Sequence, residues 1–213
     1  MHRLKLDYKV LGPIATNVYF AGNPETKECV IIDPAAKAGE IIRKLQEDDF
    51  KPAAILLTHG HFDHIMAVNE LKEKYGIPVY AHEAESEMLA HPSAGFFPRS
   101  LDDKAVTEYI PLKDGQVIEL IGYKWTVIHT PGHSAGSVCY YIPEEQVMFS
   151  GDTLFRRSYG RTDLETGSYQ EIIDSLTNKL FKIDDDAVDV FPGHGESTDL
   201  GYEKQYNDIL IDR

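Results

Sequence analysis

The sequence contains 213 residues with 42% hydrophobic and 26% charged side chains, and its formal net charge is −14. These proportions are typical of one globular domain with a substantial core, so we expect a single domain over residues 1–213. The strong negative charge repels polyanions and argues against nucleic acid or an anionic membrane surface as a partner.

The first half of the chain predicts a sheet that is followed by alternating helices and strands. Short apolar runs between Gly, Pro and Asn residues predict strands at 4–10, 17–22, 29–34, 53–59 and 77–82, the first three as an antiparallel meander. Apolar residues at helical spacing predict helices over 38–49, from Ile65 to Gly76 and over 83–90. The segment 91–104, which contains Pro92, Gly95 and Pro98, is expected to be a mobile surface loop that borders a cleft.

The second half repeats this order of strands followed by helices. Strands are expected at 116–120, 124–130, 137–142, 146–151 and 187–194. Ile172, Ile173, Leu176 and Leu180 have the spacing of one helix face, and a terminal helix follows the last strand. Two strand-rich halves that each end in helices predict an α/β fold of two packed sheets with helices outside.

No apolar run approaches the roughly 18 residues of a membrane span, and the first residues lack the apolar core of a secretory signal. We therefore predict a cytoplasmic protein without membrane association. The two cysteines, Cys29 and Cys139, fall in separate strand-like runs without the short spacing of a metal site. We expect two buried free thiols rather than a disulfide.

The stretch "LLTHGHFDHI" at 56–65 places three histidines and an aspartate in the turn between a buried strand and an amphipathic helix. His59 and His61 alternate along an extended segment and can point the same way, while Asp63 and His64 begin the helix and point at a neighbouring place. This geometry suits two adjacent metal ions. The alternative is a solvated histidine-rich loop.

Similar turns recur three times in the second half, which favours the metal site over the solvated loop. Each one places a single ligand-type side chain beside glycine, just beyond an apolar strand: His133, Asp152 and His194. Strand ends are where reactive groups reach a cleft, and glycine lets the backbone crowd a site.

These residues resemble the metallo-β-lactamase superfamily, whose His-x-His-x-Asp-His signature is matched in full. The resemblance covers essentially the whole chain and implies a four-layer αββα sandwich. It also implies two metal ions, one bound by His59, His61 and His133, the other by Asp63, His64 and His194, with Asp152 bridging them. Lactamases commonly have cysteine at the position of Asp152, whereas aspartate there, together with "GPIATNVY" and "GRTDL", is similar to the short bacterial glyoxalase II-like branch.

Histidine and carboxylate ligands suit zinc, which is our first expectation, and also iron or manganese. Two cations about 3.5 to 4 Å apart would share a water and lower its pKa to about 7, which makes hydroxide available to attack a carbonyl. We therefore place Asp63 and Asp152 among the catalytic residues. Asp33 resembles the family's aspartate that orients the histidine turn, although it can also be a simple turn residue before Pro34.

Other polar residues give weaker signals. Arg156, Arg157, Tyr159 and Arg161 are candidates for an anion-binding rim, with a solvated basic loop or a structural ion pair as the alternatives. Phe96 and Phe97 either line the cleft or pack in the core. His82 and His129 match no ligand position, so surface or supporting roles are expected.

The resemblance implies a metal-dependent hydrolase acting on a small-molecule thioester, such as S-lactoylglutathione or a related 2-hydroxyacyl thioester. Only 19 residues follow His194, so we expect no separate C-terminal glutathione-binding domain and weak glutathione specificity. The alternatives are an iron-dependent persulfide dioxygenase, a lactonase, an RNA-processing nuclease of the same superfamily and a non-catalytic metal-binding module. The sequence gives no indication of the oligomeric state.

Overall fold

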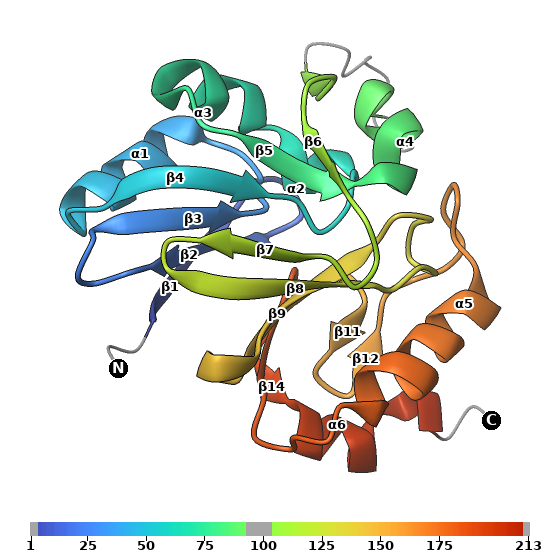
Figure 1. The fold of residues 1–213 in the computed structure, drawn as a ribbon. Coiled ribbons are helices and arrows are strands. Elements are labelled where there is room, and N and C mark those ends of the chain that lie inside the picture. Colours follow the sequence, from blue (N-terminus) through green and yellow to red (C-terminus); the bar gives the residue numbers. More distant parts are fainter. Residues whose placement is uncertain (1–3, 93–103, 211–213) are drawn as a thin grey trace.

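A computed structural model describes residues 4–92 and 104–210, which form two facing six-stranded sheets with helices on both outer sides. Figure 1 shows the four layers, with α1 and α3 outside the first sheet and α5 and α6 outside the second. The predicted αββα sandwich is confirmed.

The first sheet has the strand order β1-β2-β3-β4-β5-β6. Its strands are β1 (Lys5–Leu11), β2 (Thr16–Gly22), β3 (Glu28–Ile32), β4 (Lys51–Leu56), β5 (Val79–His82) and β6 (Ile110–Leu112). The first three strands pair antiparallel, as predicted, and β3 to β6 pair parallel. Helices α1 (Ala38–Glu47), α2 (Phe62–Ile65), α3 (Val68–Tyr75) and α4 (Ser86–Ala90) and the 3-10 turn η1 (Glu83–Glu85) belong to this half.

The second sheet has the strand order β14-β13-β10-β9-β8-β7. Its strands are β7 (Val117–Leu120), β8 (Tyr123–His129), β9 (Val138–Ile142), β10 (Val147–Gly151), β13 (Asp189–Pro192) and β14 (Thr198–Asp199), and a separate hairpin joins β11 (Leu154–Phe155) to β12 (Ser158–Tyr159). Its helices are α5 (Tyr169–Asp174), the π-helical η4 (Ser175–Lys179), α6 (Leu200–Tyr206) and the 3-10 turns η3 (Pro143–Glu145), η5 (Leu180–Lys182) and η6 (Asp208–Leu210).

Side chains point alternately to the two faces of each strand, so one strand contributes to two parts of the hydrophobic core. On β3, Val30 and Ile32 face the other sheet, whereas Cys29 and Ile31 pack among residues of α1 and α3. In the space between the sheets, Trp125 of β8 stacks on Phe149 of β10 with ring centroids 5.9 Å apart. Two rigid sheets thus fix the ends of their strands relative to each other, and the candidate site lies at those ends.

The prediction of two buried free thiols is confirmed for Cys29 and Cys139. Burial raises the pKa of both thiols, that of Cys139 to about 12. Neither thiol is therefore a reactive nucleophile at neutral pH.

Several element boundaries differ from the sequence prediction. The single helix expected from Ile65 to Gly76 is two helices, because the Ala67 backbone N–H donates to the Pro34 carbonyl at 3.0 Å instead of to its own helix. The helix predicted through Leu180 is α-helical only to Asp174 and continues in π and 3-10 form. The short strands β6, β11 and β12 were not predicted, because two or three residues carry no periodicity.

The segment 93–103 lies outside the described residues, so the predicted mobile loop and the roles of Phe96 and Phe97 stay predictions. Within residues 4–92 and 104–210, no helix combines the length and apolar character needed to cross a membrane.

Candidate metal centre

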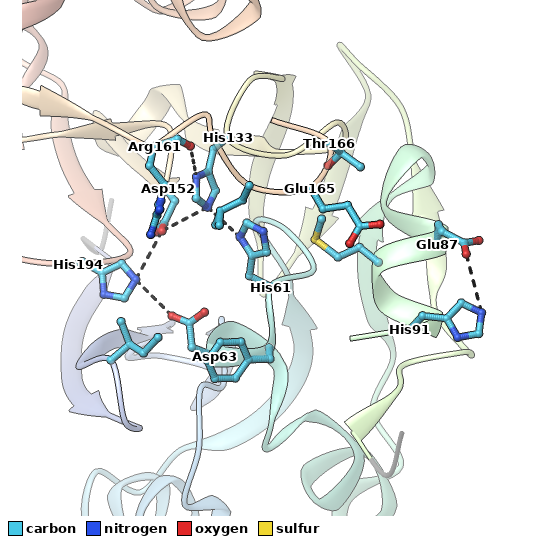
Figure 2. Close-up of a pocket in the computed structure, with 14 residues that line it drawn as sticks. His61, Asp63, Glu87, His91, His133, Asp152, Arg161, Glu165, Thr166 and His194 are labelled. Atoms are coloured by element: carbon cyan, nitrogen blue, oxygen red, sulfur yellow. Dashed lines mark hydrogen bonds and ion pairs between the residues drawn. The ribbon is translucent and has the colours of Figure 1, made fainter. Parts of the chain in front are cut away.

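All seven predicted ligand residues lie together at one end of the two sheets. His59, His61, Asp63 and His64 follow β4 of the first sheet, the last two inside α2. The second sheet supplies one residue from each of three turns, which follow β8, β10 and β13: His133, Asp152 and His194. Figure 2 shows five of these residues from both sheets converging on one space. Turns that are far apart in the sequence and belong to two different sheets are thus joined at one site.

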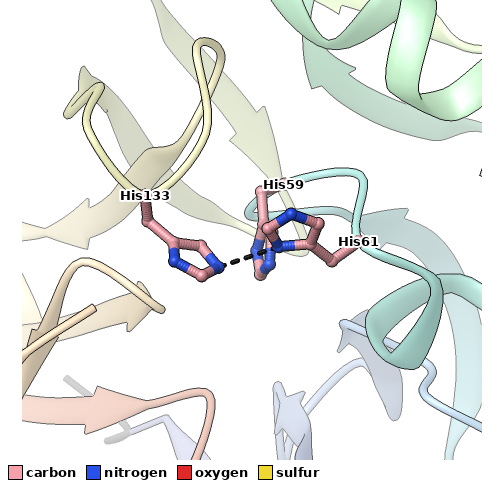
Figure 3. Close-up of side chains that lie close together, drawn as sticks. All are labelled: His59, His61 and His133. Atoms are coloured by element: carbon pink, nitrogen blue, oxygen red, sulfur yellow. Dashed lines mark hydrogen bonds between the residues drawn. The ribbon is translucent and has the colours of Figure 1, made fainter. Parts of the chain in front are cut away.

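A first triad consists of His59, His61 and His133, whose ring nitrogens lie within 4.8 Å of one another. His61 Nδ1 is 2.8 Å from His133 Nε2, and Figure 3 shows the three rings facing a common point. Three imidazole nitrogens at this spacing are a donor set suited to zinc, copper, iron or nickel.

A second triad consists of Asp63, His64 and His194, which also place one donor atom each within 4.8 Å of the others. His194 Nε2 lies 3.3 Å and His64 Nε2 lies 3.5 Å from Asp63 Oδ2. This set differs from the first because one of its donors is a carboxylate.

Asp152 stands between the triads. Its Oδ2 atom is 3.5 Å from His133 Nε2 and 3.5 Å from His194 Nε2, and its Oδ1 atom is 3.4 Å from His64 Nε2. A Cβ atom at Gly193 would collide with Asp152 Oδ1, so glycine is required there for the approach of β13. One carboxylate is thus within reach of both triads.

Several donor atoms at this site are buried without a hydrogen-bond partner in the described part of the chain. These atoms are His59 Nε2, His64 Nε2 and Asp152 Oδ1. Each unsatisfied buried polar atom costs about 1–3 kcal/mol, and all three point into the cluster. Divalent cations would satisfy them, so the residues fit a metal centre.

Hydrogen bonds behind the rings determine which nitrogen each histidine presents. Thr58 Oγ1 donates to Asp33 Oδ2 at 2.6 Å, so it accepts from His59 Nδ1 at 3.0 Å and leaves His59 Nε2 as a free lone pair. His64 Nδ1 donates to Asp33 Oδ2 at 2.9 Å, and His133 Nδ1 donates to the Arg161 carbonyl at 2.8 Å. Asp33, predicted to orient the histidine turn, thus holds two of its residues.

The two triads differ in their protonation. Burial lowers the pKa of His59 and, with the neighbouring histidines, lowers that of His61 to about 3. Burial opposes protonation of His64 too, but the carboxylates of Asp63, Asp152 and Asp33 outweigh it and raise its pKa to about 10. The pKa of Asp63 is lowered against the effect of burial, because His64, His194 and Thr16 stabilise its charge.

A family model described as "Metallo-beta-lactamase superfamily" matches residues 11–194. The chain belongs to this superfamily. Curated relatives include an uncharacterised protein of Mycobacterium leprae, 39% identical over 93% of this chain and 95% of its own length. The probable metallo-hydrolase YqgX of Bacillus subtilis is 37% identical, covering 94% of each chain. The hydroxyacylglutathione hydrolase GloC of Haemophilus influenzae is 32% identical over 87% of this chain and 89% of its own.

Solved structures of the superfamily share the fold. The BLEG-1 B3 metallo-beta-lactamase has a TM-score of 0.86 and 38% identity, covering 97% of this chain and 99% of its own. TTHA1623 in a di-iron-bound form has a TM-score of 0.83 and 36% identity, covering 94% of this chain and 98% of its own. ETHE1 from Myxococcus xanthus has a TM-score of 0.77 and 26% identity, covering 95% of this chain and 83% of its own. The chain therefore has the fold of the metallo-hydrolase superfamily to which these proteins belong, whereas its branch within the superfamily stays a prediction.

A pocket of about 320 Å³ opens over the metal centre of this metallo-β-lactamase superfamily protein. Its walls combine metal-centre residues with the apolar side chains of Ile14, Phe62, Met88 and Leu164. Across the pocket from the centre, Figure 2 shows Glu87 and His91.

Of the four residues predicted to form an anion-binding rim, Arg161 alone lines this pocket in the described structure. Its guanidinium pairs with Asp163 through two contacts of 2.7 Å. Arg156 pairs with Glu196 at 2.5 Å, and Arg157 lies 3.7 Å from Asp208. The rings of Tyr159 and Tyr169 pack together with their centroids 6.4 Å apart. The structural ion pair was the better interpretation for these arginines, and an anion-binding role stays a prediction for Arg161.

His82 and His129 lie outside both triads, as expected, and stack on each other with centroids 4.0 Å apart. Sequence reasoning missed the buried polar residues behind the site, namely Thr16, Thr58 and Glu85. The one signal for Glu85 is its position four residues before Leu89, which places an acidic residue on the buried face of a helical segment.

Proposed function

We propose that this protein is a two-metal hydrolase of thioesters, with S-lactoylglutathione or a related 2-hydroxyacyl thioester as substrate. The observation that carries the proposal is the position of Asp152, whose Oδ2 atom lies 3.5 Å from a histidine of each triad. A carboxylate within reach of both triads would allow two cations to be held close together, where both could polarise one water and one carbonyl. We assign His59, His61 and His133 to one cation, and Asp63, His64 and His194 to the other.

Divalent cations held by these triads would supply Lewis acidity and would lower the pKa of a bound water. The chain contributes the orientation of the reactants. Asp63 and Asp152 point their carboxylates at the space between the triads, where they can accept a hydrogen bond from the attacking water and aim its lone pair. Thr16 Oγ1 donates to Asp63 Oδ2 at 2.9 Å and so holds that carboxylate still.

Thioesters suit this site for two reasons. Their carbonyl is poorly stabilised by sulfur and the thiolate leaves readily, so a site built from metal ligands needs no separate acid for the leaving group. The apolar wall of Ile14, Phe62, Met88 and Leu164 can bury the methylene groups of an acyl chain or thiol carrier. The name of the H. influenzae relative, a hydroxyacylglutathione hydrolase, supports the same substrate class.

β-Lactam hydrolysis is the second candidate, because a solved structure with 38% identity is described as a B3 metallo-beta-lactamase. The persulfide dioxygenase and lactonase alternatives also remain to be tested. Zinc is our first choice of metal, but the di-iron form of TTHA1623 keeps iron in consideration. Location in the cytoplasm, and a small-molecule thioester or related acyl substrate without nucleic acid or membrane as a partner, stay predictions.

The test is a side-by-side assay of protein loaded with zinc or with iron. The substrates are S-lactoylglutathione, a simpler acyl thioester, an N-acyl homoserine lactone, a β-lactam and glutathione persulfide. We expect thiol release from the thioesters to be fastest, and Asp152→Ala to abolish it while Asp163→Ala, outside the metal centre, retains it. Oxygen uptake with the persulfide, or β-lactam opening without thioester turnover, would contradict the proposal.

A further inference from the structure

Glu85 is a buried carboxylate outside the seven-residue cluster that contacts both loops carrying the first triad. It lies at the end of η1, directly after β5, and is 1% exposed. Its Oε2 atom accepts from the Gly60 backbone N–H at 2.8 Å. Its Oε1 atom accepts from the Gly136 N–H at 2.6 Å and from the Ser134 hydroxyl at 2.5 Å. One side chain of the first sheet thus binds loops from both sheets.

The residues that Glu85 holds are direct neighbours of the first triad. Gly60 stands between His59 and His61, and Ser134 follows His133. Oε2 therefore fixes the peptide between His59 and His61, and Oε1 fixes the side chain of the residue after His133 and the Gly136 peptide of the same loop. Because the carboxylate is rigid and planar, the two loops cannot separate without breaking one of its hydrogen bonds.

The structure is closely fitted around this contact. A Cβ atom at Gly136 would lie 2.6 Å from Glu85 Cγ, so glycine is required for the loop to approach. The Ser134 and Ser137 hydroxyls are 2.7 Å apart, and the Ser134 N–H donates to Ser137 Oγ at 3.1 Å. Three short donors to one carboxylate are charge-assisted hydrogen bonds, which are about twice as strong as neutral ones.

The second triad is held by residues other than Glu85, one of which, Asp33, also reaches the first triad through Thr58 and His59. His64 is held by Asp33, and Asp63 is held by Thr16. Within the described residues, the hydrogen bonds of Glu85 go to Gly60, Ser134 and Gly136 and to no residue of that triad. A change at Glu85 should therefore reach one triad and spare the other.

We propose that Glu85 is a positioning residue that sets the separation of His59 and His61 from His133, and through it the affinity of the first triad for its cation. The inference rests on the metal assignment proposed above, but not on the identity of the substrate. Supporting contacts of this kind are worth about 10- to 100-fold in metal affinity.

The experiment separates the triads with two backgrounds. His194→Ala leaves the first triad to be measured, and His61→Ala leaves the second. Zn²⁺ affinity is determined for each background with and without Glu85→Gln, by competition with a chromophoric chelator. We expect Glu85→Gln to weaken the first triad about 10- to 100-fold and to change the second by no more than about twofold.

Glu83→Gln is the matched control, because Glu83 lies on the same turn, is exposed, and has Lys113 as its partner at 3.8 Å. It should leave both affinities unchanged. The absorption spectrum of Co²⁺ bound in the His194→Ala background gives a second readout, and Glu85→Gln should shift it because the ligand geometry changes.

Equal weakening of both triads by Glu85→Gln would show a general structural role and would overturn the inference, as would no weakening of either. If Glu85→Gln does not fold, Ser134→Ala decides the matter, since it removes one of the three donors and should weaken the first triad alone. If neither background binds Zn²⁺ before Glu85 is changed, the metal assignment itself is wrong, which is a separate result.

Discussion

The two triads lie on either side of one carboxylate, that of Asp152, but differ in charge, exposure and origin. The first consists of three imidazoles, and burial disfavours protonation of His59 and His61. The second contains Asp63, and its histidines have raised pKa values because carboxylates surround them. His194 in the second triad is 24% exposed, whereas His59 is 1% exposed.

This difference indicates that the two metal sites do not bind cations in the same way. Because their pKa values are lowered, His59 and His61 need not lose a proton at neutral pH before a cation binds. His64, whose pKa is raised by the surrounding carboxylates, already carries positive charge that a cation must displace. The first triad is therefore prepared for metal at neutral pH, while the second depends on pH.

The largest effect is expected from the residue that the triads share. Replacing Asp152 with alanine removes the carboxylate that lies 3.5 Å from His133 and from His194. Elemental analysis should give close to two metals per chain for the wild type and clearly fewer for Asp152→Ala. The rate of thioester hydrolysis should fall by more than about 100-fold, which is the upper end of the loss expected when a contact that supports a ligand is removed. Full retention of both metals would show that Asp152 does not bridge.

The next effect separates the triads. His194→Ala should lower metal content from about two to about one per chain and retain the cation of the first triad, because His59, His61 and His133 are unchanged. His61→Ala should do the reverse. The check is the metal content per chain of each variant, measured after gel filtration on equal amounts of protein. If either single change removes both metals, the triads do not act as separate sites.

Much of this comparison could be read from the sequence. The turn after β4 places His59, His61, Asp63 and His64 within six residues, and this local geometry follows from a strand that runs into a helix. The strand-end positions of His133, Asp152 and His194 also followed from the pattern, although their convergence required the family resemblance. Spacing alone cannot place three turns of one sheet against a fourth turn of another.

The supports of the site could not be predicted in this way. Glu85 and Thr16 are polar residues in helix-like and strand-like runs, where the usual expectation is exposure. Their burial depends on partners more than 40 positions away in sequence, such as Ser134 and Asp63. The ion pairs of Arg156 with Glu196 and of Arg157 with Asp208 could not be predicted either, because these acidic partners lie on distant segments.

The pH dependence of metal affinity should differ between the triads. Because His64 has a pKa raised to about 10, it is protonated at pH 7 in the metal-free protein and its proton must leave when the cation binds. Zn²⁺ affinity of the second triad, measured in His61→Ala, should therefore rise with pH, by up to about tenfold per pH unit between pH 6.5 and 8.5. The first triad, measured in His194→Ala, should change less, because His61 has a pKa of about 3 and carries no proton in this range.

Calorimetric titrations in two buffers of different ionisation enthalpy provide the check, since they count the protons released. More protons should be released by the second triad than by the first. Equal proton release from both would contradict the charge difference on which the comparison rests.

The smallest effect concerns a single hydrogen bond at the second triad. Thr16 is fully buried at the start of β2, and its hydroxyl donates to Asp63 Oδ2 at 2.9 Å. Thr16→Val keeps the shape of the side chain but removes the donor, so Asp63 loses one of the contacts that hold its carboxylate and lower its pKa. Because one such bond contributes about 1 kcal/mol, Zn²⁺ affinity in the His61→Ala background should fall about 3- to 10-fold. The same change in the His194→Ala background should leave the Zn²⁺ affinity of the first triad unaffected, since Thr16 does not hydrogen-bond to its histidines in the described structure. A loss of Zn²⁺ affinity in that background would show that Thr16 supports both triads.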